Sequence, residues 1–130
     1  MTGQQGRIRQ ISPAAPTTFT IPDANFAAFL NTTYPAIMTG SVMDIAGANA
    51  VIGQMNCSSQ NISDLSGIEY FTSITHLFCE INNLTPLDIS TLNLNLLRAH
   101  QNSLTSITGL ANQTIMGHLW VGSNERTNRH

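Results

Sequence analysis

Lysine is absent from this sequence of 130 residues, and arginine supplies all five of its basic charges. Seven acidic residues bring the net charge to −2, and charged residues make up only 9% of the chain, where about 25% is usual. Five scattered arginines form a poor surface for nucleic acid, because neutralising phosphates requires clustered cations. We therefore expect no nucleic-acid partner.

Long apolar runs are also missing, and cysteine is scarce. No stretch approaches the roughly 20 residues of a membrane-spanning helix, so we expect no membrane insertion. Cys57 and Cys79 are too few for a disulfide scaffold and lack the spacing of zinc ligands. Hydrophobic residues still make up 42% of the chain, which suffices for a core and argues against wholesale disorder. The length fits one domain.

A repeat of about 22 residues runs through the second half of the sequence. The stretch 74–84, ITHLFCEINNL, fits the pattern L-x-x-L-x-(L/C)-x-x-N-x-L at every required position. Equivalent stretches begin at residues 52, 94 and 116, so the starts are spaced by 22, 20 and 22 residues. Four stretches in one register indicate a single structural unit used four times.

The apolar residues of each unit occupy positions 1, 4, 6 and 11, and a single unit cannot bury them alone. Stacking the units would bury them as one column. Positions 4 and 6 flank an outward position 5, as in a short strand whose side chains alternate between two faces. An amide at position 9 suits hydrogen bonding to backbone groups where the chain turns away from the strand. The amides at this position are Gln60, Asn82, Asn102 and Asn124.

A helix is expected before the repeats, over the stretch IPDANFAAFL at 21–30. Pro22 and Asp23 suit its first turn, and three large apolar residues after them share one face. Pro35 ends the helix, because proline disfavours helical backbone in the residue before it. The stretch 36–51 is expected to be an irregular link with a short strand paired to the first repeat.

These repeats resemble the leucine-rich repeat family, in particular the 22-residue bacterial type of internalin-like surface proteins. The stretch 21–30 resembles the capping segment that opens the repeat arrays of secreted Bacteroidetes-type proteins. The resemblance implies an α/β solenoid, namely a right-handed leucine-rich repeat solenoid with a parallel concave sheet and an N-terminal helical cap. It also implies extracellular or cell-surface binding without catalysis, so we expect no enzyme activity and no cofactor.

The resemblance divides the chain into four parts. Residues 1–16 resemble an expression-vector leader or a disordered start, and they carry no charged-then-apolar export signal. The N-terminal cap covers 17–51, the four repeats cover 52–126, and 127–130 form a polar tail. Either the polar end acts as a minimal cap or the chain is cut from a longer array. A cut array would expose its last strand and self-associate end to end.

The two cysteines share position 6 of neighbouring units, so both thiols should point into the column. A disulfide between Cys57 and Cys79 is conceivable at the separation of adjacent strands. Parallel in-register side chains rarely offer the torsion that a disulfide requires, which favours two buried thiols.

The concave face carries the candidate binding residues. Position 5 would align Phe78, Arg98 and Trp120 at one strand spacing each. Aromatic and arginine side chains in an exposed row have the composition of binding hot spots, and Arg98 can stack on its aromatic neighbours. The other candidates on this face are His76, Glu80, His100 and His118. The alternative is that the row only covers its own sheet with mutually packed side chains.

Neither a metal site nor a catalytic site is expected. His76 and His118 lie two units apart, which places them roughly 10 Å from each other, too far to share one ion at ~2 Å. The sequence contains no nucleophile elbow, zinc-protease motif or phosphate loop. A glycosidase needs two carboxylates on one face, and the concave face offers only Glu80.

We therefore expect an extracellular or surface-displayed binding module that recognises a protein partner, or a carbohydrate, on its concave face. The alternative is a passive structural spacer, a fragment of a longer secreted repeat protein with no ligand of its own.

Overall fold

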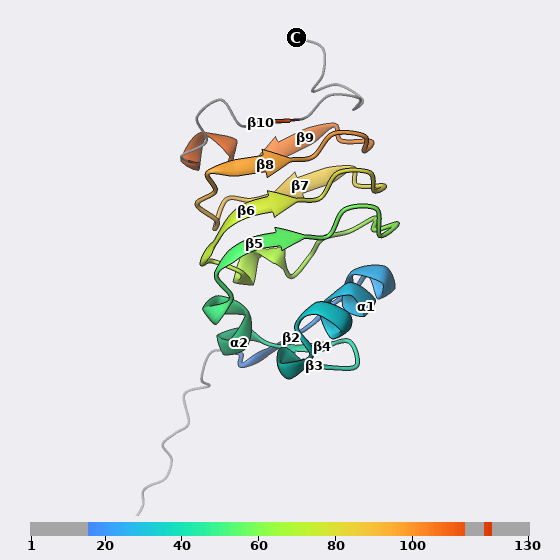
Figure 1. Ribbon diagram of the computed structural model, residues 1–130, viewed down its shortest axis with the longest axis vertical. Helices are drawn as coiled ribbons and strands as arrows, with labels where there is room; N and C mark the ends of the chain where they lie inside the picture. Colours follow the sequence, from blue (N-terminus) through green and yellow to red (C-terminus); the bar gives the residue numbers. More distant parts are fainter. Residues whose placement is uncertain (1–15, 114–118, 121–130) are drawn as a thin grey trace, which may run out of the picture.

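The computed structural model of the chain describes residues 16–113 and 119–120. Strand-and-turn units lie one above another in a column, with the helical N-terminal segment at one end (Figure 1). The elements of that segment are β2 (Thr18–Thr20), α1 (Ala24–Thr33), η1 (Pro35–Ile37), β3 (Met38–Thr39), β4 (Val42–Asp44) and α2 (Ile45–Ala50). The elements of the column are β5 (Gly53–Asn56), η2 (Ile68–Tyr70), β6 (Ile74–Phe78), β7 (Pro86–Asp88), β8 (Leu96–Arg98), β9 (Ser106–Thr108), η3 (Leu110–Asn112) and β10 (Leu119–Trp120).

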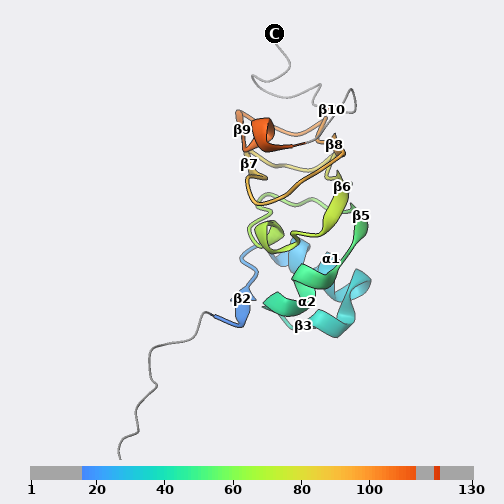
Figure 2. The ribbon, with the colours of Figure 1, turned by 90° about the vertical axis from the view of Figure 1, so that its left-hand side faces the viewer.

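One side of the column is a parallel sheet in the order β10-β8-β6-β5. Its register places Met55 opposite Leu77, Leu77 opposite Leu97, and Leu97 opposite Leu119. These are the residues that the repeat aligns at position 4. Strands β7 and β9 pair in parallel on the other side of the column (Figure 2). Each strand therefore pairs with the strand of the next unit.

The core lies between these two sides and is filled by apolar residues that recur at the same repeat positions. Position 4 contributes Met55, Leu77 and Leu97, and position 11 contributes Ile62, Leu84 and Leu104, all fully buried. Burying a side chain of this size contributes about 1.5–3 kcal/mol to the free energy of unfolding. The column thus depends on stacking for its stability.

The first unit departs from the pattern at its start. Ile52 was expected to point into the column at position 1, as Ile74 and Leu94 do, but its side chain is 77% exposed. A bulge between Gly53 and Gln54 shifts the register of β5. Gly53 adopts a φ of +84° there, a conformation that glycine tolerates best. The bulge turns Ile52 out of the column.

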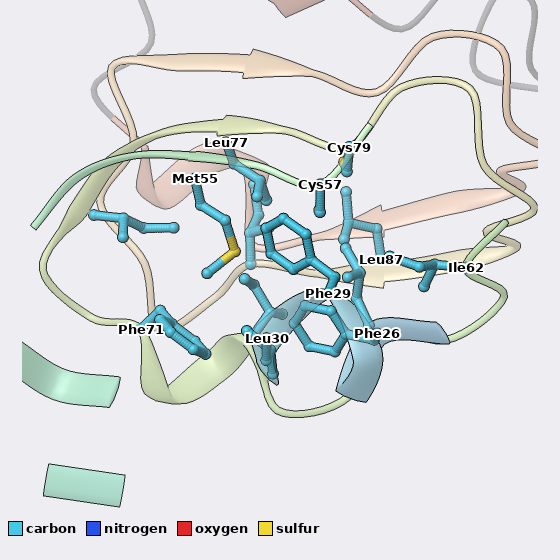
Figure 3. Packing of buried hydrophobic residues seen from close by; sticks show 14 of the residues in the cluster. Phe26, Phe29, Leu30, Met55, Cys57, Ile62, Phe71, Leu77, Cys79 and Leu87 are labelled. Atoms are coloured by element: carbon cyan, nitrogen blue, oxygen red, sulfur yellow. The ribbon is translucent and has the colours of Figure 1, made fainter. Parts of the chain in front are cut away.

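Helix α1 begins at Ala24, two residues after the proline that was expected in its first turn. Asp23 is the N-cap, and its side chain accepts hydrogen bonds from the N–H groups of Asn25 and Phe26, so Pro22 precedes the helix instead of lying in its first turn. The helix ends at Thr33, with Tyr34 as its C-cap, before Pro35. It buries Phe26, Phe29 and Leu30 beneath the side chains of the first units (Figure 3).

The link 36–51 is more regular than expected. Strand β4 pairs antiparallel with β2 and β3, and neither β3 nor β4 pairs with β5, which corrects the expectation of a strand joined to the first repeat. Gly40 in the β3–β4 turn has a φ of +59°, and Asp44 caps α2 by accepting from the N–H of Gly47. A local hairpin satisfies these backbone groups without the repeat sheet.

Polar and aromatic contacts fix this segment to the column. Asn25 Nδ2 donates to the carbonyl of Asn61 at 2.8 Å. Asn49 Nδ2 donates to the carbonyl of Tyr70 at 2.6 Å. The ring of Tyr34 packs against the ring of Phe71 with centroids 6.0 Å apart. The N-terminal segment therefore closes one end of the core.

Candidate functional site

Two of the three expected position-5 residues lie together on the strand face. Phe78 on β6 and Arg98 on β8 are register partners in adjacent strands. The guanidinium carbon of Arg98 lies 4.8 Å from the centroid of the Phe78 ring, within the range of a cation–π interaction. Both side chains are partly exposed. The strand face thus presents an arginine that is held over an aromatic ring.

The third residue of this row is described only through its backbone. Trp120 pairs with Arg98 in the sheet, but its side chain lies outside the described part of the structure, as do His118 and Asn124. The exposed position of Trp120 stays a prediction from register.

The described histidines are partly exposed and lie at different levels of the face. His76 pairs with Leu96 in the sheet, and its Nδ1 lies 2.8 Å from the hydroxyl of Thr75. His100 follows β8. Within residues 16–113 and 119–120, no three His, Cys, Asp or Glu side chains are grouped closely enough to hold a metal ion.

Glu80 follows β6 and carries an uncompensated polar atom. The residue is partly exposed, but its Oε1 is buried and has no hydrogen-bond partner among the residues that the structure describes. A buried acceptor without a donor costs about 1–3 kcal/mol, and more when it is charged. Such an atom is unusual in a folded protein and requires an explanation.

Buried asparagines tie each unit to the unit before it. Asn82 Oδ1 accepts hydrogen bonds from the N–H groups of Gln60 and Ile62, at 3.0 and 2.9 Å, and its Nδ2 donates to the carbonyls of Cys57 and Cys79 at 3.0 Å. These bonds satisfy backbone groups of two consecutive units with one side chain. The amide makes the turn after each strand possible without orphaned donors.

Asn102 repeats this arrangement one unit further on. Its Oδ1 accepts from the N–H of Leu84 at 3.0 Å, and its Nδ2 donates to the carbonyls of Cys79 and Ala99. Asn82 and Asn102, stacked at repeat position 9, are called the asparagine ladder. Gln60 does not take part, contrary to expectation: its side chain is exposed and its Nε2 donates to the carbonyl of Ser58. The first unit has the N-terminal segment before it instead of another strand, so there is no matching carbonyl for an inward amide.

The residue before repeat position 9 has left-handed backbone in all three units that the structure describes there, and this was not predicted from the sequence. Ser59, Ile81 and Gln101 have φ values of 57°, 58° and 57°. Left-handed backbone costs a residue with a Cβ roughly 1–2 kcal/mol, and a β-branched residue there is an outlier. Ile81 is also 47% exposed. The sequence carries no signal for this conformation, because the three residues are of different types and isoleucine disfavours it.

A shallow pocket of about 320 Å³ adjoins this isoleucine. The residues that line the pocket are uncharged. Two of them are hydrogen-bonded to each other, because Asn83 Nδ2 donates to Asn61 Oδ1. The lining residues are Ser59, Asn61, Ile81, Asn82 and Asn83. They belong to the loops that follow β5 and β6, on the side to which the strand arrows point in Figure 1.

Acidic residues gather instead between the units near β7. Asp64, Glu69 and Asp88 line a pocket of about 330 Å³ there. The hydroxyl and the N–H of Ser90 both donate to Asp88 and lower the pKa of its carboxyl. Ser66 donates to Asp64 in the same way. These carboxylates are satisfied by their own turns.

The two cysteines are buried free thiols that directly follow the adjacent strands β5 and β6. Burial raises the pKa of Cys57 to about 12, although a backbone hydrogen bond acts against it. Burial likewise raises the pKa of Cys79 well above its usual value. Because only the thiolate is a nucleophile or a metal ligand, neither thiol is prepared for such chemistry.

No family model matches the chain. The chain is similar to Internalin J of Listeria monocytogenes serotype 4b (strain F2365), with 33% identity over 69 residues. The aligned part is 53% of this chain but only 7% of the length of Internalin J. The similarity supports the leucine-rich-repeat-like, internalin-like character of the chain. In the described ranges no helix has the length and apolar character needed to cross a membrane.

Proposed function

We propose that the chain is a non-enzymatic binding module of the leucine-rich repeat class, a right-handed solenoid that acts outside the cell or on its surface. Its face of β5, β6, β8 and β10 recognises a protein. The observation that carries this proposal is the stacking of Arg98 on Phe78 at 4.8 Å. Similarity to an internalin over 69 residues supports the class of protein.

The stacked pair suits recognition because it is organised before any partner arrives. The Phe78 ring holds the guanidinium plane, and the paired strands hold both backbones. A restrained side chain loses little rotamer freedom on binding. Arginine and aromatic residues also dominate binding hot spots. The pair is therefore the centre of the proposed interface.

A protein ligand fits this face better than a carbohydrate. Sugars are held by stacking on exposed aromatic faces, and one face of the Phe78 ring already lies under the Arg98 guanidinium. A guanidinium edge, by contrast, matches the carboxylates and carbonyls of a protein surface. A carbohydrate array serves as the comparison.

The test compares the two faces of the column. The chain is immobilised and exposed to a panel of purified extracellular protein domains and, in parallel, to a glycan array. Phe78→Ala and Arg98→Ala should each lower retention of the protein ligand at least tenfold, as loss of a central anchor does. The matched control is Thr108→Ala on β9, on the other side of the column, which should leave retention unchanged.

Retention that is equal in all variants would remove the strand face as the interface. Absence of any retained protein would instead favour the passive spacer. Circular dichroism of each variant checks that the folds are the same. A ligand found only on the glycan array would replace the protein with a carbohydrate.

A further inference from the structure

Two unfavourable features coincide at consecutive residues where β6 ends. Oε1 of Glu80 is buried without a hydrogen-bond partner among the described residues. Ile81 is a β-branched residue with a φ of 58° and a half-exposed apolar side chain. One feature is electrostatic and the other is conformational. Local penalties that cluster in this way are typical of binding sites.

Hydrogen bonds to neighbouring units restrain the backbone of both residues. The N–H of Ser59 donates to the carbonyl of Glu80 at 3.1 Å, and the N–H of Ile81 donates to the carbonyl of His100 at 3.0 Å. Asn82 Nδ2 donates to the Glu80 carbonyl as well. Neighbouring units therefore hold the peptide backbone from both sides.

The equivalent positions show that isoleucine is not required by the fold. Ser59 and Gln101 have the same left-handed backbone as Ile81, and their polar side chains suit an exposed loop. Asparagine or glycine would fit the conformation better than any β-branched residue. The conformation of this loop therefore does not account for an isoleucine at position 81.

We propose that Glu80 and Ile81 form an anchor for a basic segment of a protein partner. A lysine or arginine of the partner pairs with the Glu80 carboxylate, and an adjacent aliphatic side chain packs on Ile81 in the 320 Å³ pocket. This inference rests on the proposed function and extends that interface around the ends of the strands.

Charge complementarity selects the basic partner. The pocket beside Ile81 is lined by neutral residues only, so Glu80, its neighbour in the chain, supplies the local charge. The chain itself has no lysine and only five arginines. A cation from a partner compensates the carboxylate in a partly desolvated site, where such a pairing is stronger than in water.

The test is a titration of the full 15N-labelled chain with two short peptides. The probe is acetyl-Leu-Lys-Leu-amide, and the matched control is acetyl-Leu-Glu-Leu-amide. The lysine peptide should shift the amide signals of residues 80–83 with millimolar affinity, and the glutamate peptide should bind at least fivefold more weakly. Equal binding of both peptides, or no shifts at 80–83, would overturn the proposal.

Variants then separate the two halves of the anchor. Glu80→Gln and Ile81→Asn should each weaken the lysine peptide at least fivefold. Ile81→Asn should also raise Tm by about 4 °C or more, because it relieves the backbone while keeping the fold. Gln101→Asn, at the equivalent position one unit on, should leave binding unchanged and should raise Tm less than Ile81→Asn does, because glutamine is not β-branched. An Ile81→Asn variant with unchanged or lower Tm would remove the conformational premise and sink the proposal.

Phe78→Ala in the same titration distinguishes this anchor from the central interface. Peptide binding that survives Phe78→Ala and is lost in Glu80→Gln supports the anchor even if no protein is retained by the strand face. Peptide binding that is unchanged by Glu80→Gln overturns the anchor. The proposed function is then decided separately, by the retention experiment.

Discussion

Ser63 donates its backbone N–H to Oδ2 of Asp23, 40 residues earlier in the chain, at 2.9 Å. The N–H of Asp64 donates to the same oxygen at 3.1 Å. The other oxygen, Oδ1, accepts from Asn25 and Phe26 and caps α1. One carboxylate therefore satisfies four backbone donors and joins the helix to the first unit.

Asp23→Asn should lower the free energy of unfolding by about 1–3 kcal/mol. The amide can still cap the helix, since Asn and Asp are equivalent at N-caps, but its NH2 group cannot accept from Ser63 and Asp64, so two backbone donors lose their partner. Urea denaturation measures the change. Asp44→Asn is the matched control, because Asp44 only caps α2, and it should cost little. Equal losses in both variants would mean that the bond to Ser63 contributes nothing.

Asn82→Ala should cost about 3 kcal/mol or more, because it orphans the N–H groups of Gln60 and Ile62 together with buried carbonyls. Gln60→Ala removes an exposed amide at the same repeat position and should cost less than about 0.5 kcal/mol. Urea denaturation of both variants gives the comparison. Similar costs would contradict the assignment of the ladder to buried asparagines.

Stability should fall as the pH rises above about 9. Burial holds the pKa of Cys57 at about 12 in the folded chain, against 9.0 for an unperturbed thiol. Between these two pH values the thiol ionises in the unfolded state but keeps its proton in the folded state. Ionisation therefore stabilises the unfolded state, and the free energy of unfolding decreases. Cys57→Ala should make this part of the profile less steep, while Cys79 still contributes to it, and Ala99 shows that the position accepts alanine. A profile that is the same in this variant would contradict the raised pKa.

Trp120→Ala should cost on the order of 1 kcal/mol or less, against about 2–5 kcal/mol for Leu97→Ala. Leu97 is fully buried at position 4, whereas the repeat assigns Trp120 to the outward position 5, next to Arg98 in the sheet. The emission of this single tryptophan should be red-shifted and quenched by acrylamide. Blue-shifted emission that resists acrylamide would place the indole in the core and break the register.

The sequence was most informative where one unit could be compared with the next. The alternation around position 5 anticipated which residues face each other in β6 and β8, and the stacking of Arg98 on Phe78 follows from that register. The amide at position 9 anticipated the bonds of Asn82 and Asn102. Repetition supplies these inferences because each unit constrains the alignment of the others.

Features that depend on neighbours outside the repeat pattern could not be predicted from the sequence. The exposure of Ile52 results from a bulge at Gly53, and the hairpin of β3 and β4 belongs to a segment with no second copy to compare. The left-handed backbone of Ile81 is imposed by the bonds of the asparagine after it, so the isoleucine alone does not reveal it. Gln60 occupies the same repeat position as the ladder asparagines, but its unit is the first, so no repeat strand precedes it.

The ladder also gives the column a direction. Asn82 satisfies the turn of the unit before its own, and Asn102 does the same for the unit of Asn82. A unit is therefore completed by its successor and not by itself. On a ribosome, which releases the amino-terminal units first, each turn keeps open backbone donors until the following strand emerges. Folding of the column should then lag synthesis by one unit, with the Asp23 junction as its earliest fixed point.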